Sequence, residues 1–341
     1  MVDQLVDVDT LGPALVTATG DERWAQPSPS LISGGKSNLT YLLTSPAGEL
    51  VFRRPPSGNV LATAHDMGRE VRVQRALADT PIPVPTIVLD DAGDLLGYPF
   101  YVMNRVAGQV IRDQLPDGYA STEAERHRMG IALVDTLAAL HAVDYQAVGL
   151  DKHGRPDGYM QRQLARWGKQ WEATRSSADH PVEELRARLA ESLPPQSDTT
   201  IVHGDFRLDN CVMDAGDPGR VAAVLDWEMS TIGDPLSDLG LLLFYWVEPG
   251  EGQSDLTPTV VDLPGFPTRA ELRERYAEVS GRDISHLPFY EAFAHFKSAA
   301  IAQGIDVRVK AGVMGGQDFG DLSETVLMVA ERGLDRLRNS Q

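Results

Sequence analysis

The first hundred residues consist of short apolar runs separated by turn-forming residues, which is the pattern of β-strands. Leu39–Thr44 and Leu50–Arg54 flank the turn-forming segment Ser45–Glu49, so we predict a β-hairpin here. We predict a helix from about Asp66 to Ala78, because its apolar residues recur at helical spacing. Prolines then end the helix, and two further strand-like runs follow: Thr86–Leu89 and Pro99–Met103.

Beyond Gly108 the pattern changes to longer segments with helical periodicity. Thr122–Glu125 forms a capping-box pattern, which predicts the start of a helix that ends near His141. Strands first and helices later, with a break near residue 105, predict a bilobal α+β fold. We expect a small β-rich lobe at residues 1–104 and a larger, mainly helical lobe at residues 105–341.

The segment 201–210 carries the strongest chemical signal. A short apolar strand runs into His203, Gly204 and Asp205, and Asn210 follows five residues later. This spacing is that of a kinase catalytic loop, in which the carboxylate lies near the attacking hydroxyl and the amide oxygen binds Mg²⁺. We therefore predict Asp205 as the catalytic base, whereas His203 is expected to hold the loop by hydrogen bonds.

Two apolar runs follow this loop, Cys211–Asp214 and Val221–Leu225, joined by a turn rich in glycine and proline. If they pair as an antiparallel hairpin, Asn210 and Asp226 lie side by side at its open end. Both offer the hard oxygen donors that Mg²⁺ prefers, so we predict them as metal ligands. For any one of these polar residues alone, a capping or turn-forming role is the alternative; the set as a whole favours a catalytic site.

A second candidate site lies in the first lobe, where Gly34, Gly35 and Ser37 precede a predicted strand. The Gly-Lys-Ser sequence is reminiscent of a Walker A motif, but Ser30 occupies the position of that motif's first glycine, and a strand follows where a helix is required. We predict a hairpin loop whose backbone N–H groups cover the phosphates of ATP. A plain β-turn is the alternative.

Arg53 and Glu70 support this interpretation. Arg53 lies on the second strand of the hairpin, where a kinase carries the cation that holds the α- and β-phosphates, and Glu70 lies on the next helix. We predict an ion pair between them, although both could be ordinary surface charges. Arg54 is an alternative to Arg53, but strand alternation directs it to the opposite face.

Asp238 stands near the start of an apolar helix that follows Gly233–Ser237. Asp234 or Ser237 could act as simple helix caps. Asp238, in contrast, is predicted to hydrogen-bond the backbone of the catalytic loop. We interpret it as structural support for the site and not as a participant in the chemistry.

Composition narrows the function classes. The net charge of −18 argues against binding to nucleic acids or anionic membranes, and Cys211, the single cysteine, excludes an intramolecular disulfide and cysteine-rich metal sites. No apolar run approaches the roughly 20 residues that span a bilayer. The segment Met1–Thr10 is acidic and lacks the features of a signal peptide, so we expect a cytoplasmic protein.

With these residues the sequence resembles the aminoglycoside phosphotransferase and choline-kinase-like superfamily, whose pattern is a His-Gly-Asp loop followed by Asp-Trp/Phe-Glu. It resembles most closely the kinase-like domains associated with acyl-CoA dehydrogenases. The most specific matches are His203–Asn210 and Leu225–Gly240. Less specific matches are Gly34–Tyr41, Val51–Gly58, Ala64–Glu70 and Pro99–Gly108.

The resemblance implies a protein-kinase-like fold with ATP bound between an N-terminal ATP-binding lobe and a C-terminal catalytic and substrate-binding lobe. It implies that Tyr101–Val106 is the hinge and contacts adenine, with Met103, Asn104 and Val106 as cofactor-binding residues. It also implies Asp205 as the base, Asn210 and Asp226 as ligands of Mg²⁺, and Arg53–Glu70 as the phosphate-positioning pair.

The chain departs from protein kinases in three ways. Arg53 replaces the usual lysine, and Trp227-Glu228 replaces Phe-Gly; an Ala-Pro-Glu element is also missing, so we do not expect a protein substrate. We predict transfer of the ATP γ-phosphate to a hydroxyl of a small molecule, hydroxyacyl-CoA-like or another hydroxylated metabolite. An aminoglycoside kinase, a non-catalytic pseudokinase and a metallohydrolase are the alternatives, and the last lacks a convincing set of further ligands.

Overall fold

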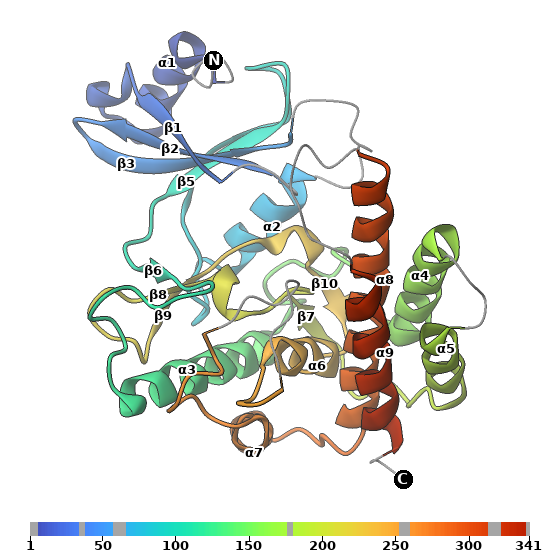
Figure 1. Cartoon of the computed structure of the whole chain (residues 1–341). Coiled ribbons are helices and arrows are strands. Elements are labelled where there is room, and N and C mark those ends of the chain that lie inside the picture. Colours follow the sequence, from blue (N-terminus) through green and yellow to red (C-terminus); the bar gives the residue numbers. More distant parts are fainter. Residues whose placement is uncertain are drawn as a thin grey trace. The chain divides into compact units, whose positions relative to one another are not determined.

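The computed structural model describes residues 6–33, 38–56, 66–175, 180–251, 260–312 and 322–338. The chain divides into two compact units (Figure 1). The first comprises Met1–Gly108 and Ala222–Ser230, and the second comprises Gln109–Val221 and Thr231–Gln341. The predicted α+β class is confirmed, with a β-sheet in the N-terminal region and helices in the C-terminal region. The roles assigned to residues 1–104 and 105–341 stay predictions.

A five-stranded antiparallel sheet in the order β1-β2-β3-β5-β4 forms the first unit. The predicted hairpin is β2–β3, and Ser45 pairs with Gly48 across its two-residue turn. Leu39 opens a strand, as expected when the Walker A interpretation was rejected. The strands are β1 (Ser28–Ser33), β2 (Leu39–Ser45), β3 (Gly48–Arg54), β4 (Ile87–Asp91) and β5 (Phe100–Asn104).

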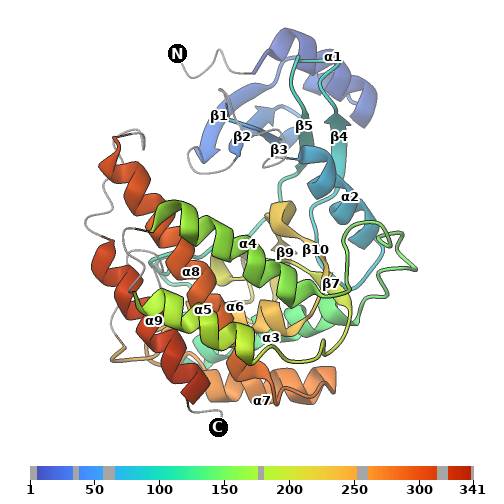
Figure 2. The same ribbon diagram turned by 90° about the vertical axis from the view of Figure 1, so that its right-hand side faces the viewer.

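Helices cover both faces of this sheet. Helix α1 (Val8–Thr19) packs over one face, where Phe52 stacks on Phe100 with ring centroids 5.1 Å apart. Helix α2 (Met67–Leu77) packs against the other face, where Val51 lies in the apolar cluster (Figure 2). Because side chains alternate along β3, Arg53 shares the face of Val51 and is directed toward α2.

Helix α8 (Leu287–Lys310) forms the core of the second unit and is buried along most of its length. Four helices pack on it, α4 (Tyr159–Thr174), α5 (Pro181–Glu191), α6 (Leu236–Tyr245) and α9 (Ser323–Arg338), as Figures 1 and 2 show. Helix α3 (Glu123–Ala142) begins with the predicted capping box and packs against α7 (Arg269–Ser280). Its inward face is buried and includes Gly130, Leu133, Leu137 and Leu140.

Short strands position the predicted catalytic loop, residues 203–210, within this helical unit. Strand β7 (Thr200–Val202) pairs with β10 (Thr231–Gly233), and β6 (Gln109–Val110) pairs with β8 (Cys211–Met213). The predicted strand before Asp226 is β9 (Val221–Val224). Cys211 is buried in β8, and burial raises the pKa of its thiol. Both features are typical of a structural cysteine and not of a nucleophile. None of the helices in the described ranges is long and apolar enough to span a bilayer.

Candidate active site

Arg53 lies at the centre of a polar cluster in the first unit. Its Nη1 donates to Oε2 of Glu70 at 3.0 Å, and its Nη2 donates to Oδ1 of Asp226 at 3.1 Å. The predicted Arg53–Glu70 ion pair is therefore formed; its role in positioning phosphates stays a prediction. Arg54 points to the opposite face, where its guanidinium lies 3.8 Å from the ring centre of Tyr98.

Burial and neighbouring charges have opposite effects on the pKa values of Arg53 and Glu70 in this cluster. Burial alone would lower the pKa of Arg53, but Tyr101, Glu70 and Asp226 together raise it well above its ordinary value. Burial also raises the pKa of Glu70, and Arg53 opposes that effect. Within the described part of the chain, the buried Nε of Arg53 makes no hydrogen bond. The guanidinium thus stays charged, and its two terminal nitrogens are committed to Glu70 and Asp226.

Three carboxylates of the first unit could hold a divalent cation. One oxygen from each of Glu70, Asp226 and Glu228 lies within 4.8 Å of the others. Asn38 connects two of them, because its Nδ2 donates to Glu70 at 3.0 Å and to Glu228 at 3.3 Å. Asp226 has a left-handed backbone with φ of 65°, a strained conformation that often occurs at functional sites.

The catalytic loop follows β7 in the second unit. The backbone N–H of Asp205 donates to Nδ1 of the buried His203 at 3.2 Å. Asn210 donates through Nδ2 to the backbone oxygen of Asp205 at 2.8 Å and to its Oδ2 at 3.0 Å. The side chain of Asp205 is 25% exposed. Its carboxylate is therefore fixed by Asn210 but remains accessible to a small molecule.

Asp238, near the start of α6, lies against the backbone of this loop. Its carboxylate accepts from the N–H of His203 at 2.6 Å and from the N–H of Gly204 at 2.8 Å. Burial tends to raise the pKa of Asp238, but His141, His203 and the Gly204 N–H bring it below its ordinary value. His141 also contacts Tyr276 at 2.7 Å, which extends the buried network to α7. The bracing contact expected of Asp238 is present.

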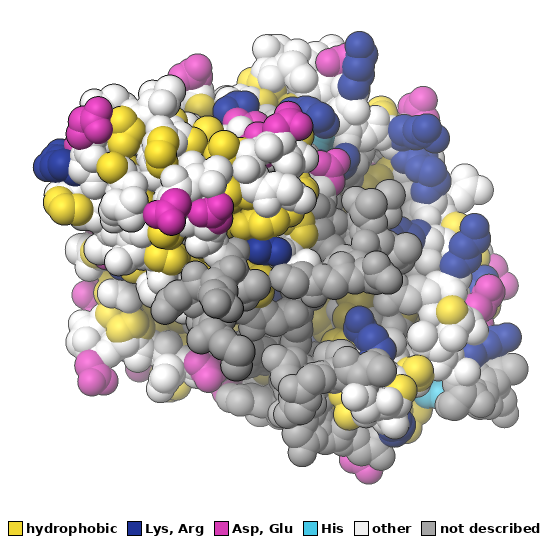
Figure 3. Space-filling view, turned by 90° about the horizontal axis from the view of Figure 1, so that it is seen from above, with side chains coloured by type: hydrophobic (Ala, Val, Ile, Leu, Met, Phe, Trp, Pro, Cys, Tyr) yellow, Lys and Arg dark blue, Asp and Glu magenta, His cyan; other side chains and the backbone are white. Residues whose placement is uncertain are grey.

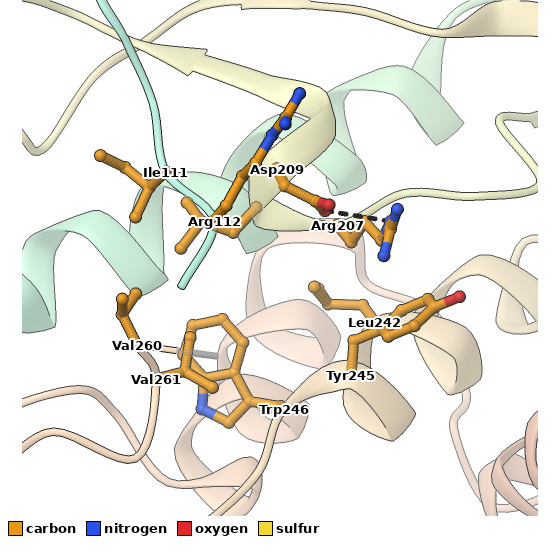
Figure 4. Close-up of a pocket in the computed structure, with 10 residues that line it drawn as sticks. Ile111, Arg112, Arg207, Asp209, Leu242, Tyr245, Trp246, Val260 and Val261 are labelled. Atoms are coloured by element: carbon orange, nitrogen blue, oxygen red, sulfur yellow. Dashed lines mark ion pairs between the residues drawn. The ribbon is translucent and has the colours of Figure 1, made fainter. Parts of the chain in front are cut away.

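A pocket opens beside the catalytic loop, entirely within the second unit (Figure 4). Arg207 borders it and lies 3.4 Å from Asp205 and 3.0 Å from Asp209, with its guanidinium 4.9 Å from the ring centre of Tyr245. Arg112 lies on the same polar side in Figure 4. The remaining lining residues are mostly apolar: Ile111, Leu208, Leu242, Trp246, Val260 and Val261.

The remaining predicted residues are distributed as follows. Gly34, Gly35 and Ser37 lie outside the described residues. Met103 and Asn104 end β5, and Val106 follows that strand. Asn210 belongs to the second unit and Asp226 to the first, so their convergence on one metal ion stays a prediction.

Sequence reasoning missed several members of these clusters. Glu228 was noticed only as a departure from protein kinases, although a carboxylate two residues after Asp226 was a usable signal. Tyr101, assigned to the hinge, donates through its hydroxyl to Glu70 at 2.8 Å.

Comparison with known protein sequences identifies a family and several relatives of this chain. The profile of the phosphotransferase enzyme family matches residues 29–286. The chain is 37% identical over 312 residues to acyl-CoA dehydrogenase family member 11 of Rattus norvegicus, which covers 90% of this chain and 40% of that protein. It is 36% identical over 306 residues to family member 10 of Mus musculus, covering 87% of this chain and 28% of that protein. The chain therefore spans less than half the length of these relatives.

The chain is also similar to solved structures of phosphotransferases. A crystal structure from Ralstonia eutropha, assigned as an aminoglycoside phosphotransferase, aligns with a TM-score of 0.83 and 33% identity, covering 98% of both chains. Aminoglycoside phosphotransferase APH(4)-Ia, solved in a ternary complex with AMP-PNP and hygromycin B, aligns with a TM-score of 0.62 and 15% identity. That alignment covers 96% of this chain and 98% of the other, and it shows a shared fold.

Proposed function

Because the chain belongs to the phosphotransferase enzyme family, we propose that it uses ATP and Mg²⁺ to phosphorylate a hydroxyl group of a small molecule. The observation that carries this proposal is the environment of the Asp205 side chain. Its carboxylate is partly exposed, fixed by Asn210, and adjacent through Arg207 to a pocket lined by apolar residues, two arginines and Asp209. This is the environment that a base needs to orient an attacking hydroxyl.

Arg53 is proposed to hold the phosphates of ATP. Its charge is secured by Glu70 and Asp226, and its buried Nε is a donor that makes no hydrogen bond within the described ranges. The complex of APH(4)-Ia with AMP-PNP supports the choice of nucleotide. We assign the adenine contacts to Met103, Asn104 and Val106, and further phosphate contacts to Gly34, Gly35 and Ser37.

Asn210 and Asp226 are the proposed ligands of Mg²⁺, with Glu228 as an additional carboxylate near Asp226. The donor set fits this cation, because Mg²⁺ prefers carboxylate and amide oxygens. When bound, Mg²⁺ supplies positive charge where negative charge develops between the β- and γ-phosphates.

Asp205 is proposed to orient the acceptor hydroxyl and to take its proton as transfer proceeds. Positioning supplies most of the catalysis in phosphoryl transfer, since the chain itself makes no covalent bond to the phosphate. Asn210 and His203 contribute by fixing the side chain and the backbone of Asp205. Asp238 holds the preceding two residues through their N–H groups.

The pocket favours a hydroxylated acceptor that combines an apolar chain with an anionic or strongly polar group, as hydroxyacyl-CoA thioesters do. Trp246, Val260 and Val261 offer an apolar wall, whereas Arg112 and Arg207 lie on the opposite side together with Asp209, which pairs with Arg207 (Figure 4). The similarity to family members 10 and 11 of the acyl-CoA dehydrogenases supports the same class.

An aminoglycoside is the second candidate acceptor, favoured by the similarity to the Ralstonia eutropha structure. The net charge of −18 would also attract a polycation. In Figure 3, however, acidic side chains on the described part of the face are scattered among apolar and basic ones. The charge is therefore a weaker guide to the acceptor than the two arginines that border the pocket.

An acceptor screen that measures ADP formation tests the proposal. The purified chain with ATP and Mg²⁺ is offered 3-hydroxybutyryl-CoA, longer hydroxyacyl-CoAs, the free hydroxy acids and kanamycin. We expect turnover with a hydroxyacyl-CoA, and Asp205→Asn should lower kcat by about 10²- to 10⁴-fold because the base is lost. The amide of this variant can still accept the hydrogen bond from Asn210.

Asp217→Asn is the matched control, because it makes the same chemical change in the exposed turn between β8 and β9. It should leave kcat unchanged. Turnover of kanamycin alone would transfer the assignment to the aminoglycoside class. Nucleotide binding without turnover of any acceptor would identify a pseudokinase, and near-normal activity of Asp205→Asn would overturn the role of the base.

A further inference from the structure

Lys297 is a buried lysine on α8 that the proposed mechanism does not use. Only 9% of the residue is exposed, and its Nζ donates to the backbone oxygen of Gly204 at 2.9 Å. An ammonium group is costly to remove from water unless it gains compensating contacts. Its position beside the catalytic loop therefore calls for a role that an apolar side chain could not fill.

The contact fixes the peptide unit that leads into Asp205. The carbonyl of this peptide belongs to Gly204 and is held by Lys297, while its N–H belongs to Asp205 and is held by His203 at 3.2 Å. Both ends of one peptide plane are thus anchored by side chains. Gly204 has φ of 84°, a conformation that favours glycine, so the anchors hold a flexible residue in a defined orientation.

Charged groups surround Lys297 on several elements. Asp205 on the loop and Asp238 on α6 attract its charge, whereas Arg166 on α4 and Arg207 on the loop oppose it. The ring centre of Trp167 lies 5.6 Å from Nζ, within the range of a cation–π contact. Burial is the main effect on the pKa of Lys297 and lowers it.

We propose that Lys297 is a positioning residue for phosphoryl transfer, which orients Asp205 by holding the Gly204 carbonyl of the peptide unit that leads into it. The inference rests on the proposed function for its catalytic consequence. The coupling between Lys297 and Asp205 is a property of the fold and can be measured without any turnover.

The first measurement is an NMR titration of the protein labelled with ¹³C at the lysine side chains. The chain has only five lysines, and the signal of Lys297 is identified by its loss in Lys297→Met. We expect Lys297 to titrate at lower pH than the four others. In Asp205→Asn its midpoint should fall further, because a neutral amide no longer attracts the ammonium group. An unchanged midpoint in Asp205→Asn would overturn the proposal.

The second measurement is kinetic, with ATP and the acceptor found in the screen. Lys297→Met should lower kcat by about 10- to 100-fold, the range expected for a lost hydrogen bond from a charged group. The KM for ATP should stay within about twofold of wild type. Lys297→Arg, which keeps charge and donors, should recover part of the activity.

Lys169→Met on α4 is the control, since that lysine is exposed. Failure of Lys297→Arg to recover any of the activity lost in Lys297→Met, or a KM for ATP that rises as much as kcat falls, would contradict the inference. If wild type turns over no acceptor, the proposed function fails while the NMR titration still decides whether Lys297 and Asp205 are coupled. If Lys297→Met does not fold, the titration in Asp205→Asn remains the deciding experiment.

Discussion

Arg53 offers the sharpest test at the scale of single residues, because it contacts two carboxylates through different nitrogens. Arg53→Lys keeps one charge but cannot reproduce this forked geometry. We expect it to weaken ATP binding by about tenfold or more, measured by isothermal titration calorimetry. Arg53→Met should in addition destabilise the fold by about 3–5 kcal/mol, since it leaves Glu70 buried without its partner.

The neighbouring residue supplies the control. Arg54→Lys changes the same side-chain type on the opposite face of β3, where Arg54 lies over Tyr98. It should leave ATP affinity unchanged. Equal affinity in Arg53→Lys and wild type would contradict the assignment of Arg53 to the phosphates.

Contacts between residues close in sequence could be predicted for this site, whereas contacts between residues far apart in sequence could not. The ion pair of Arg53 with Glu70 followed from strand alternation and the strand–helix order. The contacts of Asn38 and Lys297 could not be predicted in this way. Asn38 reaches Glu228 and Lys297 reaches Gly204 across sequence separations of 190 and 93 residues, which local patterns do not specify.

At the scale of elements, local signals explain which segments were predicted. The capping box opens α3, and the short turn between apolar runs defines the β2–β3 hairpin. Helix α1 was missed, although Asp7 caps its start and Gly20 ends it in the left-handed conformation. Strand β7 was expected as the short apolar run before His203, whereas β10, with three residues, is too short for a periodic pattern and is defined only by its pairing with β7.

The packing of α6 on α8 makes a prediction about Gly240. A Cβ at this position would lie 2.6–2.7 Å from the backbone of Tyr290, which cannot move aside as a side-chain tip can. Gly240→Ala should therefore destabilise the protein by about 1–3 kcal/mol or more in urea unfolding.

Gly304→Ala is the matched control, because a Cβ there meets only the side-chain nitrogen of Gln170 at 3.6 Å. Removing a glycine from the interior of α8 should be neutral or stabilising by up to about 1 kcal/mol. Equal stability of the two variants would show that α6 and α8 are not packed as described.

At the scale of the whole molecule, the fold class and family could be predicted from the sequence, whereas the full extent of the units could not. The return of Ala222–Ser230 to the first unit brings Asp226 to Arg53, a contact that no local pattern contains. The pocket beside Arg207 was equally hard to predict, because Arg112, Arg207 and the apolar wall come from distant segments, and the acceptor class stays a proposal.

Global stability should depend on pH through His295. Burial lowers the pKa of this histidine from 6.5 to about 4. The unfolded chain binds a proton below pH 6.5 and the folded chain only near pH 4. The stabilising contribution is thus complete above pH 6.5 and is lost as pH falls, by up to about 3 kcal/mol.

Urea unfolding at several pH values between 4 and 7 measures this dependence. His295→Asn should flatten the slope, whatever its stability at neutral pH, because the titrating group is gone. The exposed His286 provides the control, and His286→Asn should keep the wild-type slope. An unchanged slope in His295→Asn would contradict the prediction.

The central claim is that this chain moves the γ-phosphate of ATP to a hydroxyl group, with Asp205 as the base. The most direct measurement is transfer of label from γ-labelled ATP to 3-hydroxybutyryl-CoA or another accepted hydroxyacyl-CoA, with the product identified by mass spectrometry. The account predicts a Mg²⁺-dependent phosphate ester that wild type and Asp217→Asn form at equal rates and Asp205→Asn almost fails to form. Label released only as inorganic phosphate, or equal transfer by Asp205→Asn, would contradict it.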